Sequence, residues 1–318
     1  MSPQHVSGQF SKMYGYFMQQ RTYAYIAAVF NAFFIGLSFL FVKESLAAAE
    51  PFTTLAFRFA LSFAFMLVLL ATGVIAVRIP ADTIRDLLVL SLIQPVLFFS
   101  LQAFGLLSIS SSEAGIISAF VPVFVGVLGL LLLGERVNAK QFVAFFISIA
   151  GIVCLFSMGG NNGDGTSWMG MVLTLLSALA TSLYIVLGRR LTRTLDPVSL
   201  TFGMMLCGCV AFVAAAVGCE GLDAGGAVLL LGDTGFMLDV LYLGLFTSVG
   251  TSFLAMYSLK DLEAAKVGII QNLSVVVSIL AGVLVLHEAF LSYHAVGSLL
   301  IIAGVVLANV WADPETKP

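Results

Sequence analysis

Charged side chains stand out in this sequence because the residues around them are almost entirely apolar. Arg58 lies inside the apolar run 54–77, and Lys43 and Glu113 lie at the ends of other such runs. An arginine in an apolar helix needs a protein or water partner, since burying it in hydrocarbon costs at least ~2.5 kcal/mol. A guanidinium also matches a carboxylate bidentately. Arg58 is therefore either a docking point for a substrate carboxylate or half of a structural ion pair with Glu44 or Glu113.

Two amides and an aromatic ring share one face of the apolar run 86–107 if that run is a helix. Gln94, Phe98 and Gln102 follow one another at intervals of four residues, which places them on one helix face. Amides at both ends of an aromatic surface suit an amphiphilic substrate. The alternative is amide hydrogen bonding between helices, which is common in membrane proteins.

Other polar and aromatic side chains inside apolar runs are candidates for substrate contact at a central site. Hydroxyl residues in such runs more often mark close helix packing, so amides and tyrosines are preferred. The further candidates are Asn31 and Ser38, which share a helix face, and Tyr184, Tyr257, Gln271 and Asn272.

A second group of residues is assigned to structural or gating roles. Glu135 and Glu288 follow apolar runs in short polar turns, where a carboxylate pairs with a nearby donor and fixes the turn. Pro122 lies inside an apolar run, where it disturbs the helix, and Lys43 is close enough to the interface to snorkel. The group consists of Lys43, Glu113, Pro122, Glu135 and Glu288.

The sequence has no arrangement of residues typical of catalysis, metal binding or nucleotide hydrolysis. The spacing of His287, Glu288 and His294 differs from the HExxH motif of zinc proteases, and a Walker A motif is absent. The four cysteines form no pattern of a disulfide framework or metal site. We therefore expect a protein that is not an enzyme and that uses no cofactor and no metal.

The elements that position these residues must be apolar helices. Of 318 residues, 60% are hydrophobic and 10% are charged, against roughly 25% charged in an ordinary soluble domain. This composition excludes a soluble enzyme and a disordered chain. With 14 basic and 17 acidic residues and no basic block, a nucleic-acid binder is excluded as well. A polytopic membrane protein remains.

Ten apolar runs are long enough to cross a membrane as helices and lack the alternation of barrel strands. They cover residues 23–42, 54–77, 86–107, 113–133, 140–158, 168–188, 198–218, 237–258, 264–286 and 294–312. We expect an all-α fold of ten transmembrane helices. Residues 1–22 form a cytoplasmic or interfacial segment in this scheme, and residues 313–318 form a cytoplasmic tail.

Lysine and arginine residues set the predicted orientation, because they concentrate in cytoplasmic loops. Of the 14 such residues, Arg58 lies within a run. If the N-terminus is cytoplasmic, the inside segments hold twelve of the others and the outside loops hold only Lys43. The bias predicts that both termini are cytoplasmic, and it agrees with ten spans.

The two halves of the chain repeat each other. Aligned at an offset of 153, residues 114–156 and 267–309 match at 13 of 43 positions, including Glu135 with Glu288. Pro51 and Pro197 correspond in the same way, after the first and sixth runs. The unit is five helices, over 23–158 and 168–312, and an odd number inverts the second copy. Inverted repeats are typical of secondary transporters, whose substrate site lies near the bilayer midplane.

Over residues 23–312 the chain resembles the drug/metabolite transporter superfamily, of the ten-helix EamA type. The resemblance rests on the two five-helix halves, on Lys43, Pro51 and Arg58, on Pro122 followed by Gly134–Glu135, and on Glu288 with Gly297 and Gly304. It implies a secondary transporter that exports small metabolites, with amino acids favoured, across the inner membrane by alternating access. Val275 stands where a second proline would match Pro122, which departs from symmetry.

Two other functions stay open at this point. A transporter of sugar phosphates or nucleotide sugars needs several cations in its cavity, and the apolar runs offer only Arg58 and Lys43. A non-transporting scaffold or an intramembrane enzyme belongs to a different class. The expected partners are a small-molecule substrate and the lipid bilayer, with no nucleic acid, and the chain is a monomer or a homodimer.

Overall fold

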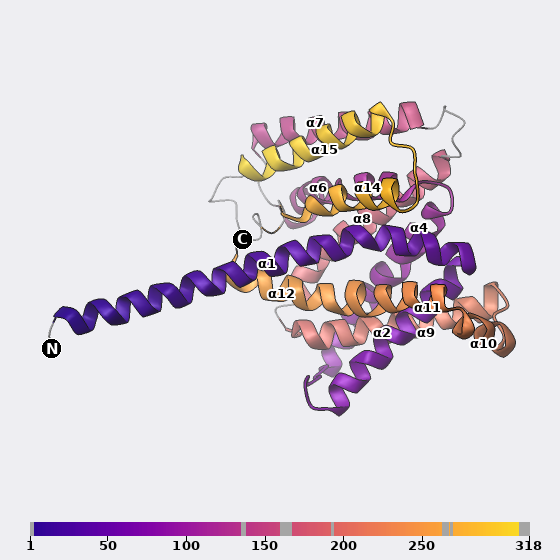
Figure 1. Ribbon diagram of the computed structural model, residues 1–318, viewed down its shortest axis with the longest axis horizontal. Helices are drawn as coiled ribbons and strands as arrows, with labels where there is room; N and C mark the ends of the chain where they lie inside the picture. Colours follow the sequence, from indigo (N-terminus) through magenta and orange to yellow (C-terminus); the bar gives the residue numbers. More distant parts are fainter. Residues whose placement is uncertain are drawn as a thin grey trace.

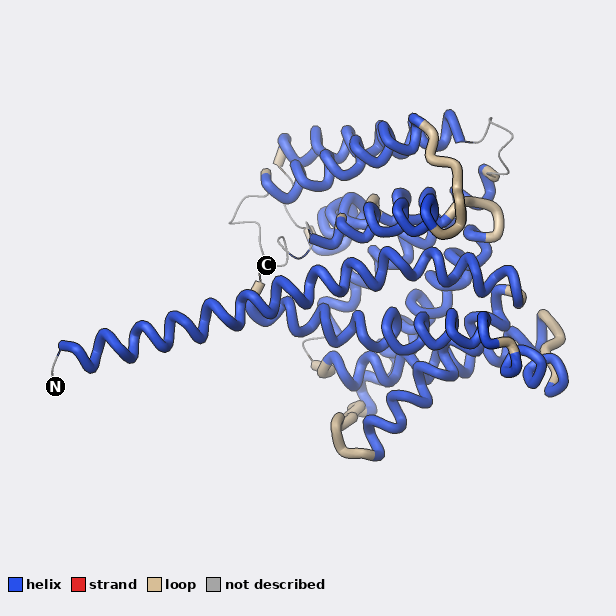
Figure 2. The backbone as a smooth tube through the Cα atoms, in the orientation of Figure 1, coloured by secondary structure: helices blue, strands red, loops and turns tan. Residues whose placement is uncertain are grey.

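A computed structural model describes residues 3–134, 138–159, 167–191, 194–262, 267 and 270–311. Within these ranges the chain is helical and contains no strand (Figures 1 and 2). An all-helical architecture satisfies every backbone polar group within its own segment, as a lipid environment requires.

The helices of the first half follow the predicted apolar runs. They are α1 (Pro3–Ala48), α2 (Pro51–Ala71), η1 (Ala81–Thr83), α3 (Ile84–Ser91), η2 (Leu92–Leu97), α4 (Phe98–Leu106), α5 (Ser111–Ser118), α6 (Val121–Leu133) and α7 (Ala139–Gly159). Those of the second half are α8 (Trp168–Leu191), α9 (Pro197–Cys219), α10 (Ala224–Gly232), α11 (Thr234–Leu241), η3 (Tyr242–Gly250), α12 (Thr251–Asp261), α14 (Leu273–Leu284) and α15 (Ser292–Val310).

Eight helical segments of the described residues are long and apolar enough to cross a membrane. They are Thr22–Ala48, Pro51–Ala71, Ala81–Leu106, Ser111–Leu132, Ala139–Met158, Trp168–Gly188, Pro197–Cys219 and Thr234–Ala255. The last two predicted runs correspond to the shorter apolar helices Leu273–Leu284 and Ser292–Ala308. The chain is thus a polytopic membrane protein.

The first helix is longer than the sequence pattern predicts. A cytoplasmic or interfacial segment over residues 1–22 stays a prediction; within the described residues α1 continues without a break from Pro3 to Ala48. Figure 1 shows the first part of α1 projecting from the bundle, while its second part packs inside it.

Three predicted runs are interrupted rather than uniform. The third changes from α3 to the π-helical segment η2, where Gln94 has φ −140° and ψ 119°. The following Pro95 lacks an N–H group and cannot continue the regular ladder. The fourth run stops after Ser118 and restarts as α6, with Pro122 in its first turn, where proline is well tolerated. The eighth passes through the second π-helical segment, η3.

The connection between the seventh and eighth predicted apolar runs contains the short helix α10. Asp223 starts this helix, because its carboxylate accepts the N–H of Gly226 at 2.7 Å. The sequence prediction missed α10 because its glycines resemble those of a loop.

Helices from the two halves pair with one another throughout the bundle. α7 packs against α15, α2 against α9, and α5 against α14. α1 packs against α12 and α14, while α8 packs against α4 and α6. Small residues permit these contacts. A Cβ atom on Gly304 of α15 would lie 2.6 Å from the Ala144 carbonyl oxygen of α7.

Candidate functional site

Arg58 of α2 is buried, with 2% of its surface exposed. Its Nε donates to Ser248 Oγ at 3.0 Å and its Nη2 donates to Thr247 Oγ1 at 3.1 Å. The Phe99 ring lies 4.2 Å from the guanidinium carbon, a cation–π distance. The alternative of an ion pair with Glu44 or Glu113 is therefore wrong for this structure, since both hydrogen bonds go to hydroxyl groups.

The two hydroxyl groups owe their orientation to the π-helical segment η3. Thr247 Oγ1 and Ser248 Oγ both donate to the Leu243 carbonyl oxygen, at 2.7 Å and 2.9 Å. With their protons engaged there, both oxygens present lone pairs to Arg58. Within the part of the chain that the structure describes, the hydrogen-bond partners of this cation are neutral. The remaining N–H donors of the guanidinium suit an anion.

A second polar cluster joins α1 to the segment before α14. Asn31 Nδ2 donates to Gln271 Oε1 at 3.3 Å, across 240 residues of sequence. Asn31 is 5% exposed. Its Oδ1 and the Nδ2 of Asn272 find no hydrogen-bond partner among the described residues. Unpaired buried amide atoms favour a water molecule or a polar ligand group.

Aromatic rings of α1 and η3 pack together near both clusters in sequence. Tyr242 of η3 donates its hydroxyl to the Phe34 carbonyl oxygen at 3.0 Å. The Phe34 and Phe246 ring centroids are 5.3 Å apart. Phe34 lies one turn after Asn31, and Phe246 directly precedes Thr247. These rings were not predicted as site residues, although aromatic residues clustered in a short stretch of each helix are a usable signal: Phe30, Phe33 and Phe34 in α1, and Tyr242 and Phe246 in η3.

The predicted face of the third span is not intact. Gln94 lies in η2 outside regular helix geometry, and its Oε1 accepts from Thr181 Oγ1 of α8 at 2.7 Å. Gln94 therefore does not share a helical face with Phe98 and Gln102 as predicted. Phe98 packs on Phe99 with ring centroids 4.5 Å apart, and Gln102 is buried in α4.

The remaining predicted candidates are more dispersed. Ser38 is buried, and its hydroxyl donates to its own helix at Ile35. Tyr184 packs beside the apolar cluster of α3, α8 and α9. Tyr257 has 42% of its surface exposed. Glu135 lies outside the described residues.

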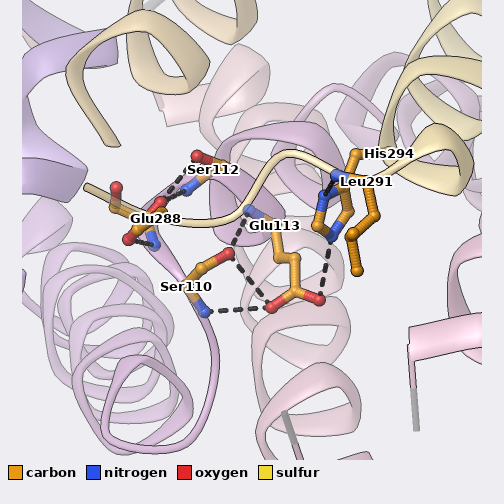
Figure 3. Close-up of polar contacts among 7 residues, drawn as sticks. Ser110, Ser112, Glu113, Glu288, Leu291 and His294 are labelled. Atoms are coloured by element: carbon orange, nitrogen blue, oxygen red, sulfur yellow. Dashed lines mark hydrogen bonds and ion pairs between the residues drawn. The ribbon is translucent and has the colours of Figure 1, made fainter. Parts of the chain in front are cut away.

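A second site lies where α1 ends and α2 begins, which we call the Lys43 end. Glu288, in the loop between α14 and α15, extends to the first turn of α5 (Figure 3). Its carboxylate accepts the N–H groups of Ser111 and Ser112 at 2.6 Å and 3.0 Å, and the Ser112 hydroxyl at 2.6 Å. A carboxylate at this position satisfies free N–H groups and complements the helix dipole.

Glu113 and His294 form a buried contact beside Glu288 (Figure 3). His294 Nε2 lies 3.4 Å from Glu113 Oε1, and the two side chains are nearly inaccessible. The other oxygen of Glu113 accepts from Ser110 N and Oγ at 3.0 Å and 3.1 Å, which completes a capping box at α5. The Leu291 N–H donates to His294 Nδ1 at 3.1 Å. α5 and α15 are thereby joined.

Two further anchors complete the Lys43 end. Lys43 Nζ donates to the carbonyl oxygens of Leu106 and Ile109 at 2.6 Å and 2.7 Å, instead of snorkelling. Glu220, which directly follows α9, accepts the N–H groups of Phe52 and Thr53 at the start of α2, at 2.8 Å and 2.7 Å. We did not predict Glu220 as a site residue, because an isolated acid before a glycine resembles a loop residue.

A known protein family matches both halves of the chain. The model of the EamA-like transporter family matches residues 22–157 and again residues 168–310. This chain belongs to the EamA-like transporter family. The resemblance to the drug/metabolite transporter superfamily is thus confirmed. Like its family, this EamA-like protein is a multi-pass membrane transporter.

Relatives of this EamA-like transporter cover nearly its whole length. It is 41% identical over 300 residues to the uncharacterized transporter YcxC of Bacillus subtilis (strain 168), covering 94% of this chain and 96% of that protein. It is 23% identical over 286 residues to an uncharacterized transporter of Archaeoglobus fulgidus, covering 89% and 97%. A crystal structure at 21% identity matches its fold with a TM-score of 0.58, covering 88% of this chain and 97% of that one.

Proposed function

We propose that this EamA-like protein is a secondary transporter that exports small metabolites, foremost amino acids, across the inner membrane by alternating access. The observation that carries the proposal is the environment of Arg58, a buried cation held by two neutral hydroxyl groups and an aromatic ring. A buried charge without a counter-ion is costly. The carboxylate of a substrate supplies that counter-ion, and an amino acid has one carboxylate to give.

The amide cluster suits the other end of an amino acid. Asn31 Oδ1 is a buried acceptor without a partner among the described residues, and Asn272 Nδ2 is a matching donor. An ammonium group donates to the first of these atoms, and a carbonyl or hydroxyl group of the substrate accepts from the second. Substrate contacts are thus assigned to Arg58, Asn31, Gln271 and Asn272.

The helix contacts support two inverted repeats that exchange roles. In the predicted repeat, α1 corresponds to α8, α2 to α9, and α3–α4 to α11–α12. Likewise α5–α6 corresponds to α14, and α7 corresponds to α15. If each helix is exchanged for its counterpart, the contacts α7–α15, α2–α9 and α5–α14 map onto themselves. The α1–α12 contact maps onto α8–α4, and the α1–α14 contact maps onto α8–α6; both of these contacts are also present. The family model also matches once in each half. Pseudosymmetric halves provide two related states, as alternating access requires.

The interrupted helices support the same mechanism. η2 and η3 are π-helical and fall in counterpart spans, the third and the eighth. π-Helical segments often occur at functional sites, and broken helices in transporters surround the substrate near the midplane. In this scheme the Lys43 end faces the outside and is closed by contacts between the repeats, from Glu288 to α5 and from Glu113 to His294.

Three competing functions are less well supported. A sugar-phosphate substrate needs more than one free cation, whereas Lys43 donates to two carbonyl oxygens. A scaffold without transport does not require a buried arginine. An intramembrane enzyme requires a nucleophile, metal or carboxylate pair at depth.

The test is a comparison of exported metabolites. The wild-type chain, Arg58→Ala and Arg85→Ala are overexpressed at matched membrane levels, and metabolites accumulating in the medium are quantified. Arg85 is an exposed arginine and provides the matched control. We expect amino acids to rise with the wild type and Arg85→Ala only. Equal accumulation with Arg58→Ala would contradict the assignment of Arg58, and no rise with any chain would contradict amino-acid export.

A further inference from the structure

We infer that His294 is a proton-binding site whose occupation releases the closure of the Lys43 end. The inference rests on the proposed function only for its place in a transport cycle. The device itself follows from the contacts that join α5 to α15.

The hydrogen bonds of His294 define its protonation. The Leu291 N–H donates to Nδ1 at 3.1 Å, so Nδ1 must present a lone pair. A neutral imidazole has one donor and one acceptor nitrogen, so the proton lies on Nε2. Nε2–H therefore points to Glu113 Oε1, 3.4 Å away. In the closed state His294 is neutral and Glu113 is a carboxylate that accepts from both His294 and Ser110.

A second proton on the imidazole is incompatible with this arrangement. It binds at Nδ1, forms an N–H bond and leaves a doubly protonated cation. Nδ1–H and the Leu291 N–H are then two donors facing each other, and their hydrogen bond is lost. Meanwhile the contact with Glu113 becomes an ion pair and grows stronger. α15 thus stays attached to α5, while the loop before it is released.

That loop carries the main latch of the Lys43 end. Glu288 lies three residues before Leu291, and its carboxylate holds the first turn of α5 (Figure 3). The Glu288 N–H also donates to the Gly282 carbonyl oxygen at 3.0 Å, which fixes the loop on the end of α14. A displaced Leu291 turns the Glu288 carboxylate away from Ser111 and Ser112, while the Glu288 backbone stays attached to α14.

The charged groups around His294 are few in the described part of the chain. Glu113 faces it from α5, and Glu288 belongs to its own loop. Lys43 of α1 lies within electrostatic range of both carboxylates. The charged residue of α7 is Lys140, at the opposite end of α15, where Asn138 donates to the Trp311 carbonyl oxygen. His287 is exposed in the same loop.

The experiment measures access to Ser111, whose side chain is fully buried in the closed state. Ser111→Cys is introduced into a chain in which Cys154, Cys207 and Cys209 are replaced by alanine. Exposed Cys219 is kept as an internal reference, because thiol reactivity itself depends on pH. The protein is labelled with a maleimide in lipid nanodiscs without substrate, and the two labelled peptides are compared by mass spectrometry.

We expect the ratio of label at the Ser111→Cys position to label at Cys219 to be about tenfold higher at ~pH 5.5 than at ~pH 8, because acidification supplies the second proton. His294→Asn keeps an acceptor for Leu291 but has no titrating group, so its ratio stays low and constant. His287→Asn is the matched control and keeps the rise; asparagine tolerates the positive φ of 53° at that position.

A constant ratio in the parent chain would overturn the inference, as would an undiminished rise with His294→Asn. If His294→Asn does not fold, His294→Gln replaces it, keeping a donor to Glu113, and an undiminished rise in that variant is equally contradictory. Because no substrate is present, the result is independent of Arg58 and of amino-acid export. If the export test fails, the labelling experiment still tests the role of His294.

Discussion

Glu288 Oε1 accepts the backbone N–H of Ser111 at 2.6 Å, although the two residues are 177 positions apart. One contact therefore ties the second half of the chain to the first turn of a helix in the other half. Glu220 does the same at the start of α2. Carboxylates of the second repeat thus hold two helix starts of the first.

Glu288→Gln is expected to lower the stability of the folded protein. The amide keeps one acceptor oxygen, but its NH2 group then faces a backbone N–H donor, and the charge that complements the start of α5 is lost; the two effects together cost at least about 1 kcal/mol. Thermal unfolding in detergent measures the change as a lower Tm. Glu44→Gln is the control, since Glu44 is an exposed carboxylate near the same end. Equal Tm values for the two variants would show that the Glu288 contact contributes nothing.

Arg58→Lys is expected to fold normally and to transport poorly. An ammonium group lacks the planar fork that reaches Thr247 and Ser248 while also meeting a carboxylate. Counterflow of radiolabelled amino acids in reconstituted vesicles should fall about tenfold, with a higher half-saturation concentration. Wild-type counterflow by a well-folded Arg58→Lys protein would mean that only the charge at this position matters.

Removing the two hydroxyl acceptors tests whether the orientation of Arg58 matters. In Thr247→Val with Ser248→Ala, both contacts of the guanidinium are lost while its charge remains. We expect the counterflow rate to drop about 30-fold, because two hydrogen bonds of about 1 kcal/mol each are lost and each 1.4 kcal/mol is a factor of ten. Ser252→Ala is the control, because that hydroxyl donates only to its own helix, at Ser248 O. Similar losses in both proteins would point to a general effect on the helix.

Gly304→Ala is expected to destabilise the α7–α15 pair. The new Cβ collides with the Ala144 carbonyl oxygen and with Ser148, and overpacking of this kind costs about 1–3 kcal/mol. The matched change is Gly218→Ala, where a Cβ meets no atom within 4 Å. Thermal unfolding should separate the two variants, with Gly218→Ala at or above the wild-type Tm. A stable Gly304→Ala protein would mean that α15 can move away from α7.

The sequence predicts the helical class, most helix positions and the need of Arg58 for a protein or water partner, because these depend on local hydrophobicity and on the cost of a charge in lipid. It does not predict the partners of Arg58, since Thr247 and Ser248 are about 190 residues away. Only the folded bundle brings them together. The ten-span layout and the assignment of substrate residues remain predictions.

Local irregularities explain most of the corrections. The even spacing of Gln94, Phe98 and Gln102 assumed a uniform helix, and η2 breaks that assumption at Gln94. α10 was missed for the opposite reason, because a capping aspartate outweighs the glycines after it. For Glu288, the pattern indicates a carboxylate in a turn, but the helix that it caps belongs to another part of the chain.

Because Thr247 and Ser248 both donate to Leu243 O, their hydroxyl oxygens act as hydrogen-bond acceptors toward any neighbouring group, whether or not Arg58 is present. Both hydroxyl oxygens offer lone pairs to whatever lies against them, because their protons are already engaged. Together with the Phe99 ring, they form a receptor for a planar cation, and the chain supplies its own ligand from α2. Arg58 occupies this site as a covalently attached ligand. In a variant with a shorter side chain at position 58, free guanidinium ion has the shape and charge to bind in its place.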